Sequence, residues 1–491
     1  MNVLDFMSDP KLAGPFFTDP TWAPWRTWLA AIFGLPLAPA ELELFRACTG
    51  RELPPSEAVR EAWAIVGRRG GKSRIAAAVA VFLAILFGVL RKGAGLGPGE
   101  LGVVMMLASD RRQARVLFRY ACGLIDASPM LAAEVGDRTM DSIRIGRVVI
   151  ETHTATFRAV RGYTLVGAVC DEAAFWRDES SSNPDEEILG AMRPGMATVP
   201  DALLLVISSP YARRGAVWNA FRAHYGRDSD VLVWKAPTRT MNASVPQALV
   251  DRALEEDEPR ARAEYLAEFR TDVETFLSRE VVEGCVVEGR RELPALAGVG
   301  YFAFCDPSGG ASDSFTLAIG HREGARGVER VVVDVLRERR APFSPEEVVR
   351  EFAELLRAYR LSTVTGDRYA AAWCSERFTV HGIRYNPADR PKSDLYAAAL
   401  AAFNGARVEL PEDRKLITQL CSLERRTSRG GRDSIDHEPG AHDDLANAVA
   451  GLVTELTGRR RGVTFADLYP PNPEGTYTPV ANVDDLRRGI R

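Results

Sequence analysis

The feature of this sequence that most constrains its fold is an apolar segment, a glycine-rich turn and a second apolar segment in direct succession. Trp63–Val66 has the composition of a buried strand, Gly67–Ser73 reads Gly-Arg-Arg-Gly-Gly-Lys-Ser, and Ile75–Leu90 is apolar. In such a strand–turn–helix unit, backbone N–H groups and the helix N-terminus can face a triphosphate. Lys72 can reach its phosphates, and the Ser73 hydroxyl can ligate Mg²⁺. The segment therefore predicts a phosphate-binding loop in an α/β fold.

This loop departs from the pattern G-x-x-x-x-G-K-[ST], because Val66 stands at the first glycine position and Gly67 follows one residue late. A chance Gly-Gly-Lys-Ser turn is the alternative, which the strand before it and the helix after it disfavour. The apolar stretch after the loop is shorter than the ~20 residues that span a bilayer, so we expect a buried helix. We assign ATP binding to Gly67, Arg68, Arg69, Gly70, Gly71, Lys72 and Ser73.

Composition narrows the class of protein. The chain has 491 residues, of which 46% are hydrophobic and 26% charged, and this indicates a globular protein of more than one domain. A net charge of −4 does not indicate a nucleic-acid or membrane surface, but it leaves room for a local basic stripe. Seven cysteines without a C-x-x-C pair argue for a reducing compartment. Acidic residues in the first ten positions argue against a secretory signal, so we expect a soluble protein.

Alternating apolar runs and helical periods predict two α/β regions. Most strands of the first region are apolar throughout, as in a parallel sheet covered on both faces. We expect these strands at Trp63–Val66, Val103–Ala108, Val148–Thr152, Leu165–Cys170 and Leu203–Ser208. In the second region we expect strands at Tyr301–Cys305, Phe315–His321, Val328–Val335 and Thr363–Thr365, and helices at Pro345–Tyr359, Lys392–Asn404 and Leu445–Leu456.

Two strands of the first region end in side chains suited to nucleotide hydrolysis. One precedes Asp171 and Glu172, and we assign Asp171 to Mg²⁺ and Glu172 to the general base that polarises the attacking water. Adjacent acids at a strand end are also common on solvated loops. The other strand ends in Ser208 and Ser209, whose hydroxyls can sense the γ-phosphate and couple it to motion, or can simply close a turn.

Acidic residues also fall at three separate elements of the second region. Asp306 ends the first strand, Asp367 follows a later strand, and Asp443 and Asp444 open the last helix. Carboxylates that converge from several elements can hold two metal ions, which stabilise attacking and leaving oxygens. Each acid alone could equally begin a turn, cap a helix or complement a helix dipole. Together they favour a metal site of all four carboxylates, with Asp306, Asp367 and Asp444 as catalytic residues.

Several further charged residues are secondary candidates. We expect Asp313 and Asp334 to be structural, and His442 to be either a metal ligand, a partner of one, or a surface residue. The basic segments Arg425–Arg432 and Arg459–Arg461 could contact DNA phosphates or could be solvated surface.

The order of these motifs resembles the large terminase subunit of tailed bacteriophages. The shifted loop with Arg68 early in it, the Asp171-Glu172 pair and the strand end Ser208-Ser209-Pro210 follow that family's order, as does Arg161-Gly162 before the acidic strand. The resemblance covers about residues 50–455. It implies a P-loop ATPase domain with a mainly parallel sheet, followed by a ribonuclease H-like nuclease domain with a two-metal carboxylate site.

The resemblance also implies an activity and partners. These are ATP-driven translocation of double-stranded DNA into a prohead and metal-dependent endonucleolytic cutting of concatemeric DNA. The cofactors would be ATP and Mg²⁺, with Mn²⁺ able to substitute in the nuclease site. The implied partners are DNA, a small terminase subunit and the portal protein, in the host cytoplasm and with no membrane. In this family the active motor is a ring on the portal, whereas the isolated chain is often a monomer.

Two other functions stay open at this point. One is an ATP-dependent helicase-nuclease of repair or defence, although the sequence contains no second phosphate loop. The other is a non-catalytic, nucleotide-gated docking protein whose acids are structural. Ring motors often complete a phosphate site with an arginine from a neighbouring subunit, and Arg68 could act within its own subunit instead. The candidates for the arginine from a neighbour are Arg144, Arg147, Arg158 and Arg161.

The sequence thus predicts five segments. They are an N-terminal helical segment at 1–50, the ATPase domain at 51–245, a helical connection at 246–294, the nuclease domain at 295–462 and a flexible tail at 463–491.

Overall fold

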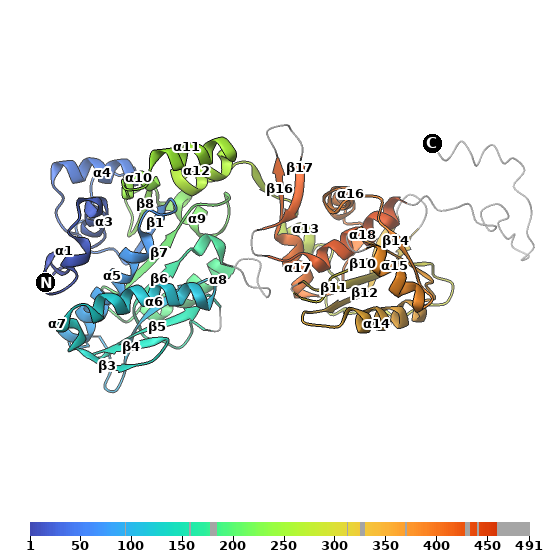
Figure 1. Cartoon of the computed structure of the whole chain (residues 1–491), viewed down its shortest axis with the longest axis horizontal. Helices are drawn as coiled ribbons and strands as arrows, with labels where there is room; N and C mark the ends of the chain where they lie inside the picture. Colours follow the sequence, from blue (N-terminus) through green and yellow to red (C-terminus); the bar gives the residue numbers. More distant parts are fainter. Residues whose placement is uncertain are drawn as a thin grey trace, which may run out of the picture. The chain divides into compact units, whose positions relative to one another are not determined.

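The computed structural model describes residues 1–93, 95–156, 159–176, 184–311, 313–324, 329–368, 371–427, 433–438 and 441–458. These residues form two compact units (Figure 1). Unit 1 comprises Met1–Phe276 and Cys421–Ala441, and unit 2 comprises Leu277–Leu420 and the described residues from His442 onward. The predicted tail and the basic segment Arg459–Arg461 lie outside the described residues.

Unit 1 is built on an eight-stranded sheet with the order β3-β4-β5-β2-β6-β7-β1-β8. The strands from β5 to β8 in this order are all parallel, and β3 and β4 add an antiparallel edge. This confirms the mainly parallel sheet. The strands are β1 (Glu61–Val66), β2 (Gly102–Ala108), β3 (Val135–Arg138), β4 (Ser142–Ile145), β5 (Val148–Thr154), β6 (Leu165–Asp171), β7 (Leu203–Ser208) and β8 (Val231–Ala236). We did not predict β3, β4 or β8.

The helix after the phosphate loop is the centre of this unit. α5 (Lys72–Ile85) continues into a π-helical turn, η2 (Leu86–Leu90). The stretch Lys72–Leu90 is long and apolar enough to cross a membrane, but 72% of its most apolar window is buried inside the protein. It is therefore a core helix, as predicted. The N-terminal helices α1 (Val3–Ser8), α3 (Ala23–Ile32) and α4 (Pro39–Thr49) share this core.

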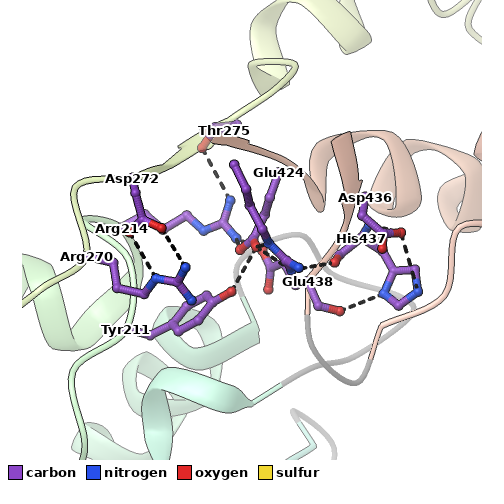
Figure 2. Close-up of polar contacts among 10 residues, drawn as sticks. Tyr211, Arg214, Arg270, Asp272, Thr275, Glu424, Asp436, His437 and Glu438 are labelled. Carbon is purple, nitrogen blue, oxygen red and sulfur yellow. Dashed lines mark hydrogen bonds and ion pairs between the residues drawn. The ribbon is translucent and has the colours of Figure 1, made fainter. Parts of the chain in front are cut away.

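A second, three-stranded sheet in unit 1 joins segments that are far apart in the sequence. Its order is β17-β16-β9, all antiparallel, with β9 (Val273–Thr275), β16 (Leu423–Thr427) and β17 (Asp433–His437). Arg425 and Arg426 of the basic segment thus lie on a strand, and residues 428–432 are outside the described range. The strand is held by Glu424, which is fully buried and accepts a hydrogen bond of 2.8 Å from the Tyr211 hydroxyl (Figure 2).

Unit 2 contains a six-stranded mixed sheet with the order β14-β13-β10-β11-β12-β15. β10, β11 and β12 are antiparallel neighbours, and β13 and β14 continue the sheet parallel to β10. Numbered along the chain, the first five strands have the order 3-2-1-4-5 of a ribonuclease H-like fold, as predicted. The strands are β10 (Tyr301–Asp306), β11 (Phe315–Glu323), β12 (Arg330–Arg339), β13 (Thr363–Gly366), β14 (Arg384–Pro387) and β15 (Val408–Glu409).

Helices cover this sheet on both faces (Figure 1). α14 (Pro345–Ala358) packs Phe352 edge-on against Phe315 of β11, with the ring centroids 5.2 Å apart. α16 (Lys392–Asn404) and α18 (Asp444–Gly458) pack against each other, and α18 crosses β10 and β11. α18 approaches β10 closely because it carries Gly451, where a Cβ atom would lie 2.5 Å from the Phe304 ring. This close approach brings the acidic start of α18 to the end of β10.

Two candidate active sites

The first candidate site lies where three neighbouring strands of unit 1 end. β6, β7 and β1 are adjacent and parallel, with Asp171 opposite Ile207 and Ile65 opposite Ser208. Because parallel strands end at the same edge of a sheet, Asp171, Ser208 and the loop after Val66 come together there. The topology thus brings together all three motifs that the sequence analysis singled out in this region.

The phosphate loop is held from outside by side chains that sequence reasoning missed. The Trp25 indole donates a hydrogen bond of 2.7 Å to the Gly70 carbonyl. The Thr238 hydroxyl and the Asn242 amide donate to the carbonyls of Arg68 and Arg69, each at 2.8 Å. These donors come from α3, α10 (Thr238–Met241) and the residue after it. No sequence motif identifies these donors, although the tryptophan-rich stretch before residue 30 could have indicated that this segment packs against the rest of the domain.

Glycine is required at two positions of the loop. At Gly67, a Cβ atom would lie 2.3 Å from the Thr238 hydroxyl oxygen. Gly71 has a φ of +94°, and a Cβ atom there would also lie 3.1 Å from the rings of Trp22 and Trp25. A glycine at Gly71 avoids the steric cost that other residues meet at positive φ. The side chains that pack against the loop therefore explain why glycine occupies positions 67 and 71, although the motif is shifted.

Lys72 connects the loop to the neighbouring strand ends. It is buried, and its Nζ donates to the Val66 carbonyl at 2.7 Å and to the Ser209 hydroxyl at 2.8 Å. The Glu172 carboxylate lies 3.6 Å from the same Nζ. A single ammonium group thus contacts the loop, the candidate general base and one of the two candidate coupling residues.

Asp171 has the environment of a metal ligand. Its side chain is buried and hydrogen-bonded to Ser73, and its Oδ1 has no hydrogen-bond partner among the described residues. Burial, and then the neighbouring Glu172 carboxylate, raise the pKa of Asp171 to about 7. A buried carboxylate with an unpartnered oxygen beside a serine hydroxyl fits the oxygen-ligand preference of Mg²⁺.

Glu172 lies just beyond the strand with a left-handed backbone, φ +51°. This conformation is uncommon for a residue other than glycine. Its Oε2 accepts a hydrogen bond of 3.2 Å from the Ser209 N–H, and Ser208 Oγ accepts one of 3.2 Å from the Ala174 N–H. The two serines therefore contact the acidic turn directly, one by its backbone and the other by its side chain.

A large cleft opens beside the loop. Its volume is about 1080 Å³, which is ample for a nucleotide. The loop residues 68–74 and Glu172 line it on the side of the phosphate loop. Aromatic side chains that sequence reasoning did not assign line other parts of the wall, namely Phe16, Trp22, Tyr120 and Tyr265.

The candidate arginines are used in different ways. Arg147 donates to the carbonyls of Gly97 and Glu100, at 2.6 and 2.9 Å, and so holds a turn together. Arg144 donates to the Gly146 carbonyl at 3.0 Å. Arg161 is exposed, and Arg158 lies outside the described residues.

The second candidate site is an acidic cluster in unit 2. Asp306 ends β10 and accepts a hydrogen bond from the side chain of Asn447 on α18. Desolvation and the carboxylates of Asp444, Asp443 and Asp367 raise the pKa of Asp306 to about 8. These causes show that the four predicted acids lie close enough to interact. An excess of negative charge with buried oxygens fits divalent cations. Asn447 was missed from the sequence because its partner is far along the chain.

The two acids at the start of α18 have different surroundings. Asp443 is buried, and Lys392 and Tyr396 of α16 contact its carboxylate. Asp444 is partly exposed, and its Oδ2 accepts a hydrogen bond of 3.3 Å from the Ser314 N–H. Burial is also the main cause of the raised pKa of Asp444.

The remaining candidates are spread around this cluster. Asp367 follows β13, and its carbonyl accepts a hydrogen bond of 2.6 Å from the Tyr385 hydroxyl. Asp334 is buried on β12 and bonded to His321 at 2.6 Å. His442 and Asp313 are exposed and lie 3.9 Å apart.

The two sheets and their sites define the class of this protein: a P-loop ATPase domain combined with a ribonuclease H-like domain. Residues 45–224 match the family model described as terminase large subunit, ATPase domain. This match confirms the resemblance noted from the motifs of this part of the chain.

Solved structures of phage terminases are also similar to this chain. The large terminase of bacteriophage HK97 is 17% identical, with a TM-score of 0.40, and the match covers 92% of this chain and 99% of that one. A mutant form of the ATPase domain of the Thermus phage P74-26 large terminase is 17% identical, with a TM-score of 0.36, over 49% of this chain and 98% of that one. The large terminase nuclease of thermophilic phage G20c with bound magnesium is 14% identical, with a TM-score of 0.31, over 36% and 97%. No curated protein sequence matches the chain.

Proposed function

We propose that this chain is a DNA-packaging motor that hydrolyses ATP to translocate double-stranded DNA and cuts that DNA with a metal-dependent endonuclease. The observation that carries the proposal is that the Lys72 ammonium contacts both the Ser209 hydroxyl and the Glu172 carboxylate. These residues lie in the part of the chain that matches the terminase ATPase domain. A phosphate-binding lysine, a water-orienting acid and a hydroxyl next to both are what a hydrolysis-driven motor needs. The ribonuclease H-like sheet with its acidic cluster supports the nuclease half.

In the ATPase site, Lys72 would turn from the Val66 carbonyl to the phosphates. Ser73 and Asp171 would hold Mg²⁺, which neutralises phosphate charge when it is bound. Glu172 would orient the attacking water and accept its proton. Ser209 contacts both Lys72 and Glu172, so a change in either contact would move the end of β7. This is the basis for proposing Ser208 and Ser209 as coupling residues.

In the nuclease site, Asp306, Asp367 and Asp444 would hold divalent metal, Mg²⁺ or Mn²⁺. The metal supplies positive charge for the attacking and leaving oxygens of the phosphodiester. Asn447 would keep the Asp306 carboxylate in place through its hydrogen bond.

The motor would work with other proteins and with copies of itself. A ring on a portal protein, supplied with DNA by a small terminase subunit in the host cytoplasm, would be the active form. Of the candidate arginines, we favour Arg161 as the one that reaches a neighbour's site, because Arg161 is exposed whereas Arg144 and Arg147 are half-buried.

The test uses one purified chain and two assays, DNA-dependent ATPase and plasmid cleavage with Mg²⁺ or Mn²⁺. Glu172→Gln should lose ATPase activity and keep cleavage, and Asp306→Asn should lose cleavage and keep ATPase activity. This double separation is expected because the two sites lie in different units. A wild-type chain with neither activity would favour a docking protein, and cutting that required ATP-driven strand separation would favour a helicase-nuclease.

A further inference from the structure

The two acids at the start of α18 differ in what holds their carboxylates. Lys392 Nζ lies 3.0 Å from Asp443 Oδ1 and 2.8 Å from Oδ2, so the ammonium bridges both oxygens. The Tyr396 hydroxyl donates a third contact to Oδ2 at 2.7 Å. Asp443 is only 4% exposed. Its carboxylate is thus neutralised and hydrogen-bonded by α16, within the cluster that contains Asp306.

This arrangement is built into the packing of α16 against α18. Lys392 is the first residue of α16 and Tyr396 lies one turn later on the same face. The Thr454 hydroxyl of α18 donates to the Leu395 carbonyl of α16 at 3.0 Å and fixes the two helices further along. Tyr396 is fully buried, whereas the Lys392 side chain is 31% exposed. The ammonium therefore lies at the border between the buried cluster and the surface.

Two-metal sites place two cations on the reacting phosphate, one near the attacking oxygen and one near the leaving oxygen. A lysine ammonium carries a positive charge and three donors, so it can bind a phosphate oxygen while it stays paired with a carboxylate. A carboxylate with both oxygens already bound to an ammonium is a poor ligand for a second metal ion. Asp444, by contrast, accepts one hydrogen bond on Oδ2 from the described residues, and it is a long one of 3.3 Å.

We propose that Lys392, held by Asp443 and Tyr396, supplies the positive charge that a second metal ion supplies in a two-metal nuclease, so that this site takes one divalent cation. That cation would be held by Asp306, Asp367 and Asp444. Asp443 then positions Lys392 and does not ligate metal. The inference rests on the proposed nuclease function and narrows it.

The first test counts Mn²⁺ ions bound to the full-length chain, by the loss of the free-ion paramagnetic resonance signal, without nucleotide. The number of ions that Asp306→Asn binds is subtracted from each count, because these ions are bound outside the nuclease site. We expect a difference of one ion between the wild type and Asp306→Asn. In Lys392→Met the freed Asp443 carboxylate should raise this difference to two, whereas Lys392→Arg keeps a cation on Asp443 and should leave it at one.

The second test follows the rate of plasmid cleavage as Mn²⁺ is raised to saturation. The kinetic order of plasmid cleavage with respect to Mn²⁺ concentration should be one for the wild type and for Lys392→Arg. It should be two for Lys392→Met. Arg337→Met is the matched control, because it removes a cation from an ion pair of the same unit, with Glu292 at 2.7 Å. It should change neither the ion count nor the order.

Breaking a buried ion pair can destabilise a protein, so the thermal midpoint of each variant is measured as well. Lys392→Arg keeps the test valid if Lys392→Met does not fold. Two ions in the wild type, or an unchanged count in a folded Lys392→Met, would overturn this inference alone. Cleavage by Asp306→Asn at the wild-type rate would instead overturn the nuclease function itself.

Discussion

The Tyr211 hydroxyl donates a hydrogen bond of 2.8 Å to the carboxylate of Glu424, which lies 213 residues further along the chain. Arg426 also binds this fully buried carboxylate. Arg214 binds both this carboxylate and that of Glu438 (Figure 2). Tyr211 comes two residues after Ser209, so the network starts at the end of the candidate coupling strand. It fastens a segment from the second half of the chain into unit 1.

Removal of the Glu424 carboxylate should therefore loosen the segment from Cys421 to Ala441. Glu424→Ala leaves two arginines without their buried partner and should cost about 3–5 kcal/mol. Tyr211→Phe removes one hydrogen bond and should cost about 1 kcal/mol. Thermal unfolding of the two variants measures the difference, and limited proteolysis shows where the chain has opened. Equal effects of the two substitutions would contradict the central role of the carboxylate.

The hydrogen bond from Trp25 to the phosphate loop should matter for nucleotide binding. Trp25→Phe removes the donor to the Gly70 carbonyl, which should weaken ATP binding by roughly five- to tenfold, the equivalent of about 1 kcal/mol. The matched control is Trp28→Phe. Trp28 is equally buried, but its indole N–H has no hydrogen-bond partner among the described residues. Fluorescent-nucleotide titration of both variants makes the comparison, and similar losses in both would assign the effect to packing.

Lys72 and Glu172 should differ in which step of ATP hydrolysis they affect. Lys72→Ala removes the ammonium that holds the phosphates, so both binding and turnover should fall. Glu172→Gln keeps the side-chain shape and the Asp171 carboxylate, so it should bind nucleotide and fail to hydrolyse it. Both variants should lose ATPase activity by at least about 10²-fold. Turnover at the wild-type rate by either, with DNA and portal present, would refute the assignment.

The raised pKa of Asp306 predicts a dependence of stability on pH. The folded state keeps this proton up to pH about 8, whereas the unfolded chain releases it near the ordinary value of 3.8. The contribution of this carboxyl is therefore complete below pH about 4 and is lost as the pH rises toward 8. In chelator, the melting temperature of the wild type should fall relative to that of Asp306→Asn between pH 5 and 8. Mg²⁺ should restore the wild type at pH 8, and parallel curves for the two proteins would contradict the prediction.

An arginine that acts on a neighbouring subunit should be revealed by mixing. Arg161→Ala and Lys72→Ala subunits should each lack ATPase activity alone, and together on portal rings they should regain part of it. The gain is expected because some interfaces then combine an intact loop with an intact arginine. Arg147→Ala serves as the comparison, since its loss should unfold the turn at Gly97 and Glu100 without rescue. No rescue with Arg161→Ala would contradict this assignment, and no rescue with any of the four candidate arginines would favour Arg68 within the same subunit.

The sequence alone was sufficient for features that depend on neighbouring residues. The strand before Gly67 and the apolar helix after Ser73 follow from a short, strongly apolar pattern, and this pattern specifies both elements locally. The same reasoning identified the acids at strand ends, because their position along the chain sets their position at the edge of a sheet. The short strands β3 and β4 were missed, since they are stabilised by pairing, β4 with β5 and β3 with β4.

Tertiary structure decided everything that depends on partners far along the chain. The sequence offers Asp443 and Asp444 as equivalent neighbours, but in the structure Asp443 precedes α18 and Asp444 is the first residue of that helix. The packing of α16 against α18 then places a lysine and a tyrosine on Asp443, whereas Asp444 accepts a hydrogen bond from the Ser314 N–H. In the same way, the sequence does not distinguish Trp25 from other core tryptophans, and only the fold places its indole N–H beside the Gly70 carbonyl. Local patterns determined which residues could react, and long-range packing determined which of them are held in place to do so.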